Sequence, residues 1–154
     1  MAKQLLIVSH SRSGNTARLA EAVVGAAGEV GGTGVEVRAL SPFEAEADDV
    51  ASAQGIVLGT PANFGYMSGA LKDFFERIYH PCLDRTVGLP YCLFVKGDTD
   101  ADGAVTSVQR IVAGLRWHQV LAPLVVVGPL TEDDLARAAE MGATMAAGLE
   151  ADIF

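Results

Sequence analysis

Apolar residues gather along the chain in five short runs, and longer segments with a helical period separate them. The runs are rich in branched side chains and cover 4–8, 35–40, 55–59, 91–95 and 120–127. None alternates strictly between apolar and polar positions, which is typical of strands that are buried on both faces of a parallel sheet. We therefore expect five strands, with helices covering both faces of the sheet.

The segments around these runs place apolar side chains on one helical stripe. The pattern predicts helices over 16–27, 68–79 and 104–115 and a short one at 48–53. The glycine-rich stretch 28–34 is expected to end the first helix. Thr131, followed by three acidic residues, predicts the capped start of a last helix.

Alternating strands and helices predict a doubly wound α/β fold, arranged as a three-layer sandwich. A length of 154 residues suits a single domain that spans the whole chain. In open sheets of this class, ligands bind beyond the carboxyl ends of the strands, where the strand order reverses. The loops after the first, third and fourth strands are therefore the expected place of a binding site.

Composition narrows the possible partners. Asp and Glu outnumber Lys and Arg by 19 to 11, which gives a net charge of −8 and disfavours nucleic acid as a partner. Half of the residues are hydrophobic, too many for a disordered chain. The longest uncharged apolar run, 120–130, is too short to span a membrane. We expect a soluble cytoplasmic protein in which Cys82 and Cys92 are reduced thiols.

The loop after the first strand carries four hydroxyl side chains and a glycine directly before a helix. Free N–H groups at a helix N-terminus and nearby hydroxyls can hold a phosphate with few cationic side chains. Gly14 would let the backbone close around such an anion. The alternative is an ordinary polar loop that caps the helix, and the position after the first strand favours the anion site.

Other phosphate and nucleophile motifs do not occur. The chain has neither G-x-x-x-x-G-K-[ST] nor G-x-G-x-x-G, and it has no G-x-S-x-G elbow. A phosphorelay receiver would need acidic residues where Ser9, His10 and Thr60 stand. Asp98, Asp100 and Asp102 alternate before Gly103, but they lack the downstream Glu of a calcium-binding EF-hand loop, so no metal site is expected.

Two loops resemble a known family. Residues 11–16, Ser-Arg-Ser-Gly-Asn-Thr, resemble the phosphate signature of flavodoxins. Residues 59–75, from Gly-Thr-Pro-Ala-Asn-Phe-Gly to Lys-Asp-Phe-Phe, resemble the tryptophan-repressor-binding-protein type of NAD(P)H:quinone oxidoreductases and related FMN reductases. The resemblance extends over essentially the whole chain. It implies the flavodoxin-like strand order 2-1-3-4-5, with FMN where the order reverses.

The resemblance also implies which residues hold the cofactor. The phosphate would be held by Ser9, Ser11, Arg12, Ser13, Gly14, Asn15 and Thr16. The isoalloxazine ring would lie beside Thr60, Pro61, Ala62, Asn63, Phe64 and Gly65, and near Lys96, Gly97, Asp98 and Thr99. Phe64 can supply an aromatic wall, and Gly65 permits close backbone approach. The acidic residues of the third loop would disfavour negative charge on a reduced ring and lower its potential.

Two functions follow from these expectations. The first is an oxidoreductase that passes electrons from NAD(P)H through FMN to a small acceptor such as a quinone, with no catalytic side chain of its own. The second is a flavodoxin-type electron shuttle whose acidic surface docks on protein redox partners. A fold that has lost its cofactor is the third alternative. The Ala- and Gly-rich segment 138–149 also leaves a homo-oligomer open.

Overall fold

The computed structural model describes residues 2–11 and 14–154. Strands and helices alternate along the chain, as the hydrophobic pattern predicts. The elements are β1 (Lys3–Ser9), α1 (Asn15–Gly31), β2 (Val35–Leu40), α2 (Ala47–Ala51), β3 (Gly55–Pro61), α3 (Gly69–Cys82), β4 (Pro90–Gly97), α4 (Asp102–Gly114), β5 (His118–Gln119), β6 (Leu124–Val127) and α5 (Glu132–Glu150).

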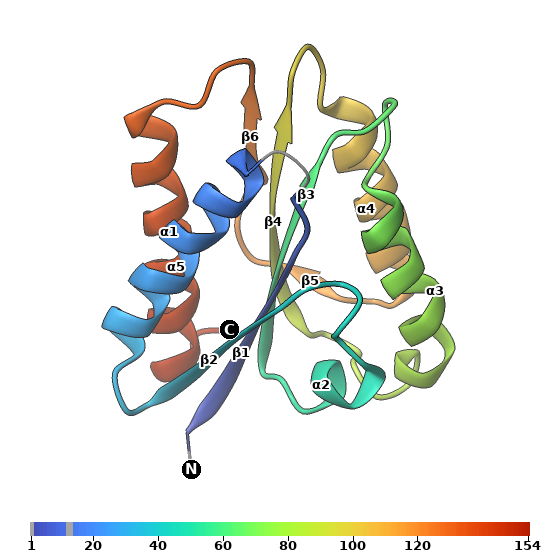
Figure 1. Ribbon diagram of the computed structural model, residues 1–154. Helices are drawn as coiled ribbons and strands as arrows, with labels where there is room; N and C mark the ends of the chain where they lie inside the picture. The colour runs from blue at the N-terminus through green and yellow to red at the C-terminus, as the bar shows by residue number, and fades with distance from the viewer. Residues whose placement is uncertain (1, 12–13) are drawn as a thin grey trace.

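All neighbouring strands of the sheet are parallel, in the order β2-β1-β3-β4, and both β5 and β6 pair with the outer edge of β4. The predicted order 2-1-3-4-5 is thus confirmed, with two short strands sharing the fifth position. Parallel strands end at the same edge of a sheet, so the carboxyl ends lie together at the top of Figure 1. The order reverses between β1 and its neighbours β2 and β3, which marks this edge as the expected ligand position.

Helices cover both faces of the sheet (Figure 1). On one face α1 and α5 bury a core that includes Leu19, Val23 and Met145. On the other face α3 and α4 bury a core that includes Phe74 and Trp117. Because the strands are covered on both sides, their side chains are apolar in both directions, which explains the missing alternation in the sequence.

The α1 and α5 helices approach each other closely. A Cβ atom at Gly142 of α5 would overlap the backbone carbonyl of Val23 in α1. The buried side chains of α5 include Ala138, Met141 and Ala146. The small residues of this segment therefore pack within the molecule, against α1.

The largest differences from the predicted boundaries occur in the first helix and the last strand. The first helix runs past Gly28 to Gly31 and ends at Gly32, which has φ 52° and donates its N–H to the carbonyl of Gly28. Of the predicted strand 120–127, only Leu124–Val127 forms a strand, β6, and the two-residue strand β5 before the gap 120–123 was not predicted. Pro123 lies in the gap, and proline cannot donate a hydrogen bond to a neighbouring strand.

Among the described residues, no helix combines the length and the apolar character that crossing a membrane requires.

Candidate functional site

Three loops leave the carboxyl edge of the sheet, and each carries residues that the sequence assigns to the site. Loop 1 (10–14) follows β1, loop 2 (62–68) follows β3, and loop 3 (98–101) follows β4. β1 and β3 are adjacent strands, as are β3 and β4. The fold therefore brings together three segments that are far apart in the sequence.

Loop 1 turns directly from β1 into α1. The N–H of His10 donates to the carbonyl of Gly59 on β3, at 3.1 Å. The hydroxyl of Ser11 accepts a hydrogen bond from the N–H of Gly14, at 2.9 Å. Gly14 has φ 89°, a conformation that favours glycine, and no atom lies near the position of a Cβ there. The predicted site residues Arg12 and Ser13 lie outside the described residues.

Among the described residues, α1 is the one long helix whose start combines no side-chain cap bond with no acidic residue in the first turn. The start of α4 also lacks a side-chain cap bond at its N-cap Ala101, but it has Asp102 in its first turn. Thr131 caps α5, which has three acidic residues in its first turn, and Ser68 caps α3. In contrast, α1 has Gly14 at its N-cap, no side-chain cap bond and no acidic residue in its first turn, as far as the described residues show. Its free N–H groups and the positive end of its dipole therefore favour an anion at this position.

The first turn of α1 directs polar side chains both inward and outward. Thr16 is 1% exposed and lies on the inner face of the helix, whereas Asn15 is partly exposed. Ser9, at the end of β1, is also partly exposed. The predicted phosphate residues that are described therefore occupy one short segment at the start of α1.

Near the end of β3, just before loop 2, the hydroxyl of Thr60 joins this strand to the start of α3. Thr60 is completely buried, and its hydroxyl accepts from the N–H of Ser68 at 2.9 Å and donates to the carbonyl of Pro61 at 2.8 Å. The N–H of Ala62 donates to the carbonyl of Lys96 on β4, at 2.9 Å. These bonds fix the position from which loop 2 projects.

The tip of loop 2 is a tight turn. Asn63 and Tyr66 exchange two backbone hydrogen bonds, of 2.8 and 3.0 Å. The two residues between them, Phe64 and Gly65, have φ values of 52° and 71°. Two positive values are characteristic of a type I′ turn, and this conformation is unfavourable for phenylalanine by about 1–2 kcal/mol. The ring of Phe64 is fully exposed, so it does not pack against α3.

Loop 2 rests on the start of α4. A Cβ atom at Gly103 would overlap the carbonyl oxygen of Gly65. The N–H of Met67 also donates to the hydroxyl of Ser107 in α4, at 3.3 Å. Gly103 and Ser107 thus support the turn that carries Phe64. The sequence analysis assigned no role to this support, because the contact joins residues that are about forty positions apart.

Lys96 was expected in a loop, but it lies within β4, one residue from the end of the strand. Its side chain is only 6% exposed. The ammonium group donates to the carbonyl of Gly97 at 3.0 Å and lies 3.4 Å from a carboxylate oxygen of Asp98. A buried lysine at the end of a strand is therefore a feature of this edge.

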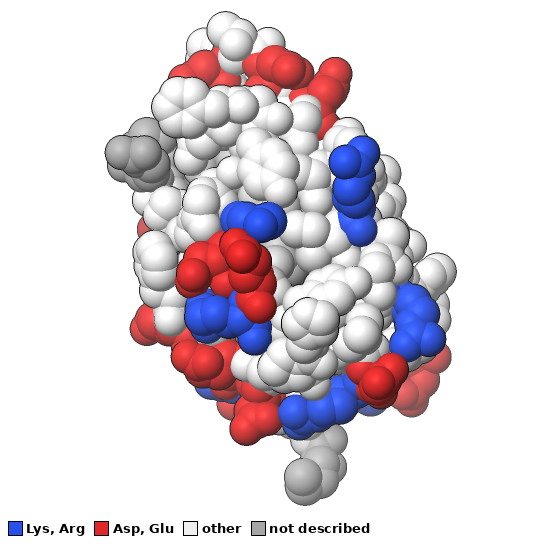
Figure 2. All heavy atoms as spheres, turned by 90° about the vertical axis from the view of Figure 1, so that its right-hand side faces the viewer, with Lys and Arg blue, Asp and Glu red and all other residues white. Residues whose placement is uncertain are grey.

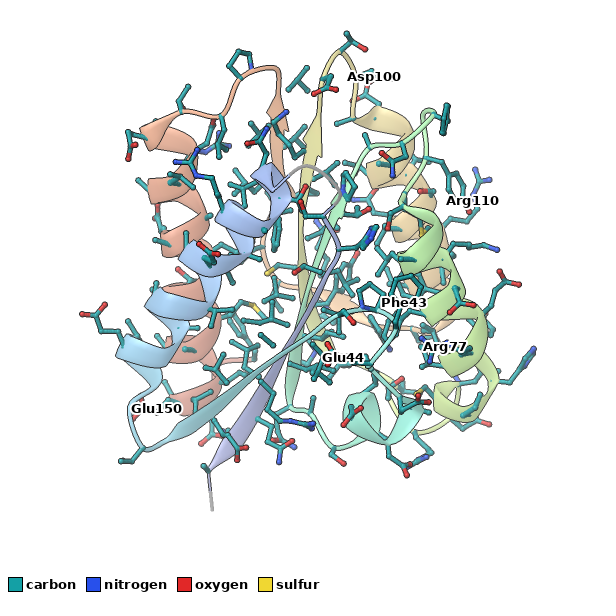
Figure 3. The ribbon with its side chains drawn as sticks, in the orientation of Figure 1. Phe43, Glu44, Arg77, Asp100, Arg110 and Glu150 are labelled. Atoms are coloured by element: carbon teal, nitrogen blue, oxygen red, sulfur yellow. The ribbon has the colours of Figure 1, made fainter. Side chains whose placement is uncertain are left out.

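The acidic residues of loop 3 point into solvent. The side chain of Asp98 is 99% exposed, and Thr99 is exposed as well. Asp100 lies at the top of the loop, directed away from the sheet (Figure 3), and its carboxylate accepts from the N–H of Asp102 at 3.0 Å. Within 2–11 and 14–154, no group of three His, Cys, Asp or Glu side chains is arranged to hold a metal ion.

Hollows occur at the carboxyl edge and elsewhere. One of about 610 Å³ lies between loop 1, the outer side of α1 and the end of β2, and Ser9, His10 and Ser11 line part of it. A groove of about 310 Å³ lies between α3 and α4, on the face that Figure 2 presents, and Phe75, Tyr79 and Ile111 line it. Of the two, only the first adjoins the predicted site residues.

Comparison with known proteins finds relatives that match part or most of the chain. No family model matches it. A flavodoxin of Aquifex aeolicus is 34% identical over 59% of this chain. That match covers 48% of the flavodoxin, so the chain spans about half the length of this relative. An NAD(P)H dehydrogenase (quinone) of Acidithiobacillus ferrooxidans is 29% identical over 94% of this chain and 84% of its own length.

Solved structures show the same fold. An archaeal flavodoxin has a TM-score of 0.81 and 17% identity, and the match covers 96% of this chain and 99% of that one. A flavodoxin, WrbA-like protein of Agrobacterium tumefaciens has a TM-score of 0.78 and 20% identity, covering 97% and 99%. The chain therefore has the flavodoxin-like fold, with NAD(P)H dehydrogenases (quinone) among the relatives that match most of its length.

Proposed function

We propose that the chain binds FMN at the carboxyl edge and passes electrons from NAD(P)H through the flavin to a small acceptor such as a quinone. The observation that carries the proposal is the N-terminus of α1, which no side chain of the described residues caps, at the point where the strand order reverses. A helix start with free N–H groups and no acidic residue is suited to a phosphate monoester. The names of the quinone dehydrogenase relatives support the choice of reaction.

The residues at this edge fit both ends of a flavin nucleotide. Hydroxyl groups and N–H groups between Ser9 and Thr16 would hold the phosphate. The exposed ring of Phe64, on a turn that Gly103 supports, would offer an apolar wall to the flat isoalloxazine. Gly97 at the end of β4, together with Asp98 and Thr99 of loop 3, would supply backbone N–H groups to the polar edge of the ring.

Bound FMN supplies the hydride and electron transfer, and the chain supplies binding and orientation. Thr60 fixes the start of loop 2 through its two hydrogen bonds. The contact between Gly65 and Gly103 fixes the tip of the same loop. These contacts would hold loop 2, and with it the ring, in one orientation. No acid–base side chain takes part in the proposed mechanism.

Reconstitution with FMN and anaerobic mixing with NADPH test the proposal. We expect the fluorescence of FMN to be quenched on binding, and the flavin absorbance band to bleach rapidly when NADPH is added. A chain that leaves FMN fluorescence unchanged would refute the proposal. Turnover with a soluble quinone, measured by NADPH consumption, then tests the acceptor.

The acidic composition favours a second candidate, an electron shuttle for protein partners. The net charge of −8 would attract a basic redox partner, and one relative is named flavodoxin. This function predicts that FMN binds but that NADPH does not reduce it directly, whereas a one-electron donor does. The same stopped-flow experiment therefore separates the two candidates.

A further inference from the structure

We propose that the ammonium group of Lys96 is a buried positive charge that pairs with the phosphate of the bound flavin nucleotide. This inference rests on the proposed function and adds a specific partner to the phosphate site. Three observations carry it, namely the burial of the lysine, its incomplete pairing and its position relative to α1.

The burial of Lys96 is unusual for its residue type. Its side chain is 6% exposed, while lysine is almost never buried in proteins unless it is paired. An ammonium group is strongly hydrated, and removing it from water is unfavourable without compensating partners. Lys96 therefore places a charged group at a buried position where an apolar side chain would extend the hydrophobic core.

The pairing of Lys96 within the described residues is incomplete. An ammonium group has three donors, and only Gly97 and Asp98 accept from it. The carbonyl of Gly97 is neutral. The carboxylate of Asp98 lies 3.4 Å away, longer than the 2.7–2.9 Å that is common for charge-assisted bonds, and it is 99% exposed. Water screens that carboxylate, so the buried charge lacks an equally buried counter-charge.

The position of Lys96 directs it to the face of the sheet that α1 covers. Successive side chains of a strand point to opposite faces, so Lys96 points to the same face as Phe94 and Cys92. Those two residues belong to the core beneath α1 and α5. In the sheet, Lys96 is level with Pro61 of β3 and Val126 of β6, at the carboxyl edge.

The helix α1 reaches this part of the sheet with its N-terminal end. It contacts β1, β3 and β4 as well as β2. Its C-terminal end lies against β2, where a Cβ at Gly31 would crowd Val35. The N-terminal part is therefore the part that crosses toward β4, and Figure 1 shows α1 beginning at the carboxyl edge.

Two sources of positive potential thus meet on one face of the edge. One is the ammonium group of Lys96, and the other is the uncapped N-terminus of α1. Placed together they disfavour each other, since the helix dipole is positive at its N-terminus. A phosphate dianion would interact favourably with both the ammonium group and the positive end of the helix dipole. The phosphate of FMN is therefore the partner that this arrangement fits best.

Two variants test the role of Lys96. Lys96→Met keeps a side chain of similar length and removes the charge. Lys72→Met is the matched control, because Lys72 lies on α3 in an exposed ion pair with Glu76 and its loss changes the net charge equally. The dissociation constants of FMN and of riboflavin, which lacks the phosphate, are measured for each apoprotein by fluorescence quenching.

We expect Lys96→Met to weaken FMN binding about 10- to 100-fold, the range for a lost hydrogen bond to a charged group. Riboflavin binding should change less than about twofold, and Lys72→Met should change neither constant. An equal loss for both flavins would overturn the proposal, because it would mean that Lys96 only joins β4 to loop 3. Unchanged FMN binding would overturn it as well.

A measurement without flavin separates this inference from the proposed function. Unfolding of the apoprotein is followed by the fluorescence of Trp117, with and without inorganic phosphate. We expect phosphate to raise the Tm of the wild type and of Lys72→Met more than that of Lys96→Met. An equal rise in all three proteins would overturn the role of Lys96. If phosphate raises the Tm of the wild type but the wild type does not bind FMN, the proposed function is refuted, while the anion site at Lys96 remains supported.

Discussion

Thr60 and Lys96 are both buried polar residues at the carboxyl edge, but the fold satisfies their hydrogen-bonding groups to different degrees. The hydroxyl of Thr60 has two partners on its own chain, so its burial is compensated within the fold. The ammonium group of Lys96 is compensated only in part. Sequence patterns did not reveal this difference, because burial at the end of a strand depends on which helix lies above it.

Cys92 offers a prediction at the scale of one residue. Burial raises the pKa of its thiol far above the value of about 8.5 in the unfolded chain. The unfolded state therefore loses its proton first as the pH rises. The stability that this group contributes is complete below about pH 8.5 and declines above it, by up to about 1.4 kcal/mol per pH unit.

We expect the free energy of unfolding to fall between pH 9 and 11, and to fall less steeply in Cys92→Ala. Burial also raises the pKa of Cys82 and of Tyr91, so a residual slope remains in the variant. Urea unfolding at several pH values, followed by Trp117 fluorescence, measures both slopes. Val57→Ala is the control, since Val57 is a buried neighbour of Cys92 that does not titrate. Equal slopes in wild type and Cys92→Ala would contradict the prediction.

Among the elements, the hydrophobic pattern predicted α1 to α4 and the five longer strands, while Thr131 and the acidic residues after it predicted the start of α5. The glycine-rich stretch 28–34 ends α1 as predicted, but the helix continues four residues beyond the predicted end at 27, because of the glycines in this stretch only Gly32 adopts a positive φ. The pattern also began the last strand at 120 instead of Leu124, because the apolar run continues through the gap that contains Pro123, and it missed β5, whose two residues are polar. Both errors arise where backbone conformation, rather than hydrophobicity, decides the boundary.

The contact between loop 2 and α4 gives a prediction at this scale. Gly103→Ala would place a methyl group against the carbonyl of Gly65 and displace the turn that carries Phe64. Overpacking of this kind costs about 1–3 kcal/mol, although alanine is otherwise favoured over glycine in a helix. We expect a lower Tm in thermal unfolding and weaker FMN binding in fluorescence titration.

Gly69→Ala is the matched control for this substitution. Gly69 is the first residue of α3, and no atom lies near the position of its Cβ. The same exchange should leave the Tm unchanged or raise it slightly. A Gly103→Ala protein that is as stable as Gly69→Ala and binds FMN like the wild type would show that the contact does not support loop 2.

At the scale of the whole molecule, the position of the three candidate loops at one edge of the sheet was predictable, and their detailed shape was not. Alternation of strands and helices places loops 1, 2 and 3 at one edge, so Gly14, Thr60 and Gly97 were expected there. The turn at Phe64 was not expected, because phenylalanine rarely adopts a positive φ. The supporting contact at Gly103 depends on the tertiary placement of α4, which no local pattern encodes.

The proposed function requires that an anion binds at the start of α1, which no described side chain caps. Gly14→Asp places a carboxylate at the N-cap, where it would compete with a phosphate for the same N–H groups. Gly88→Asp is its matched control, because Gly88 also has a positive φ, 79°, and open space at its Cβ, but precedes β4 at the opposite edge.

Calorimetric titration of the two apoproteins with FMN tests this claim most directly. The backbone strain and the added charge are alike in the two variants, so any difference between them reports on the position of the carboxylate. We expect Gly14→Asp to lose at least about 100-fold in FMN affinity and Gly88→Asp to bind FMN like the wild type. Equal affinity of Gly14→Asp and the wild type for FMN would refute an anion site at the start of α1.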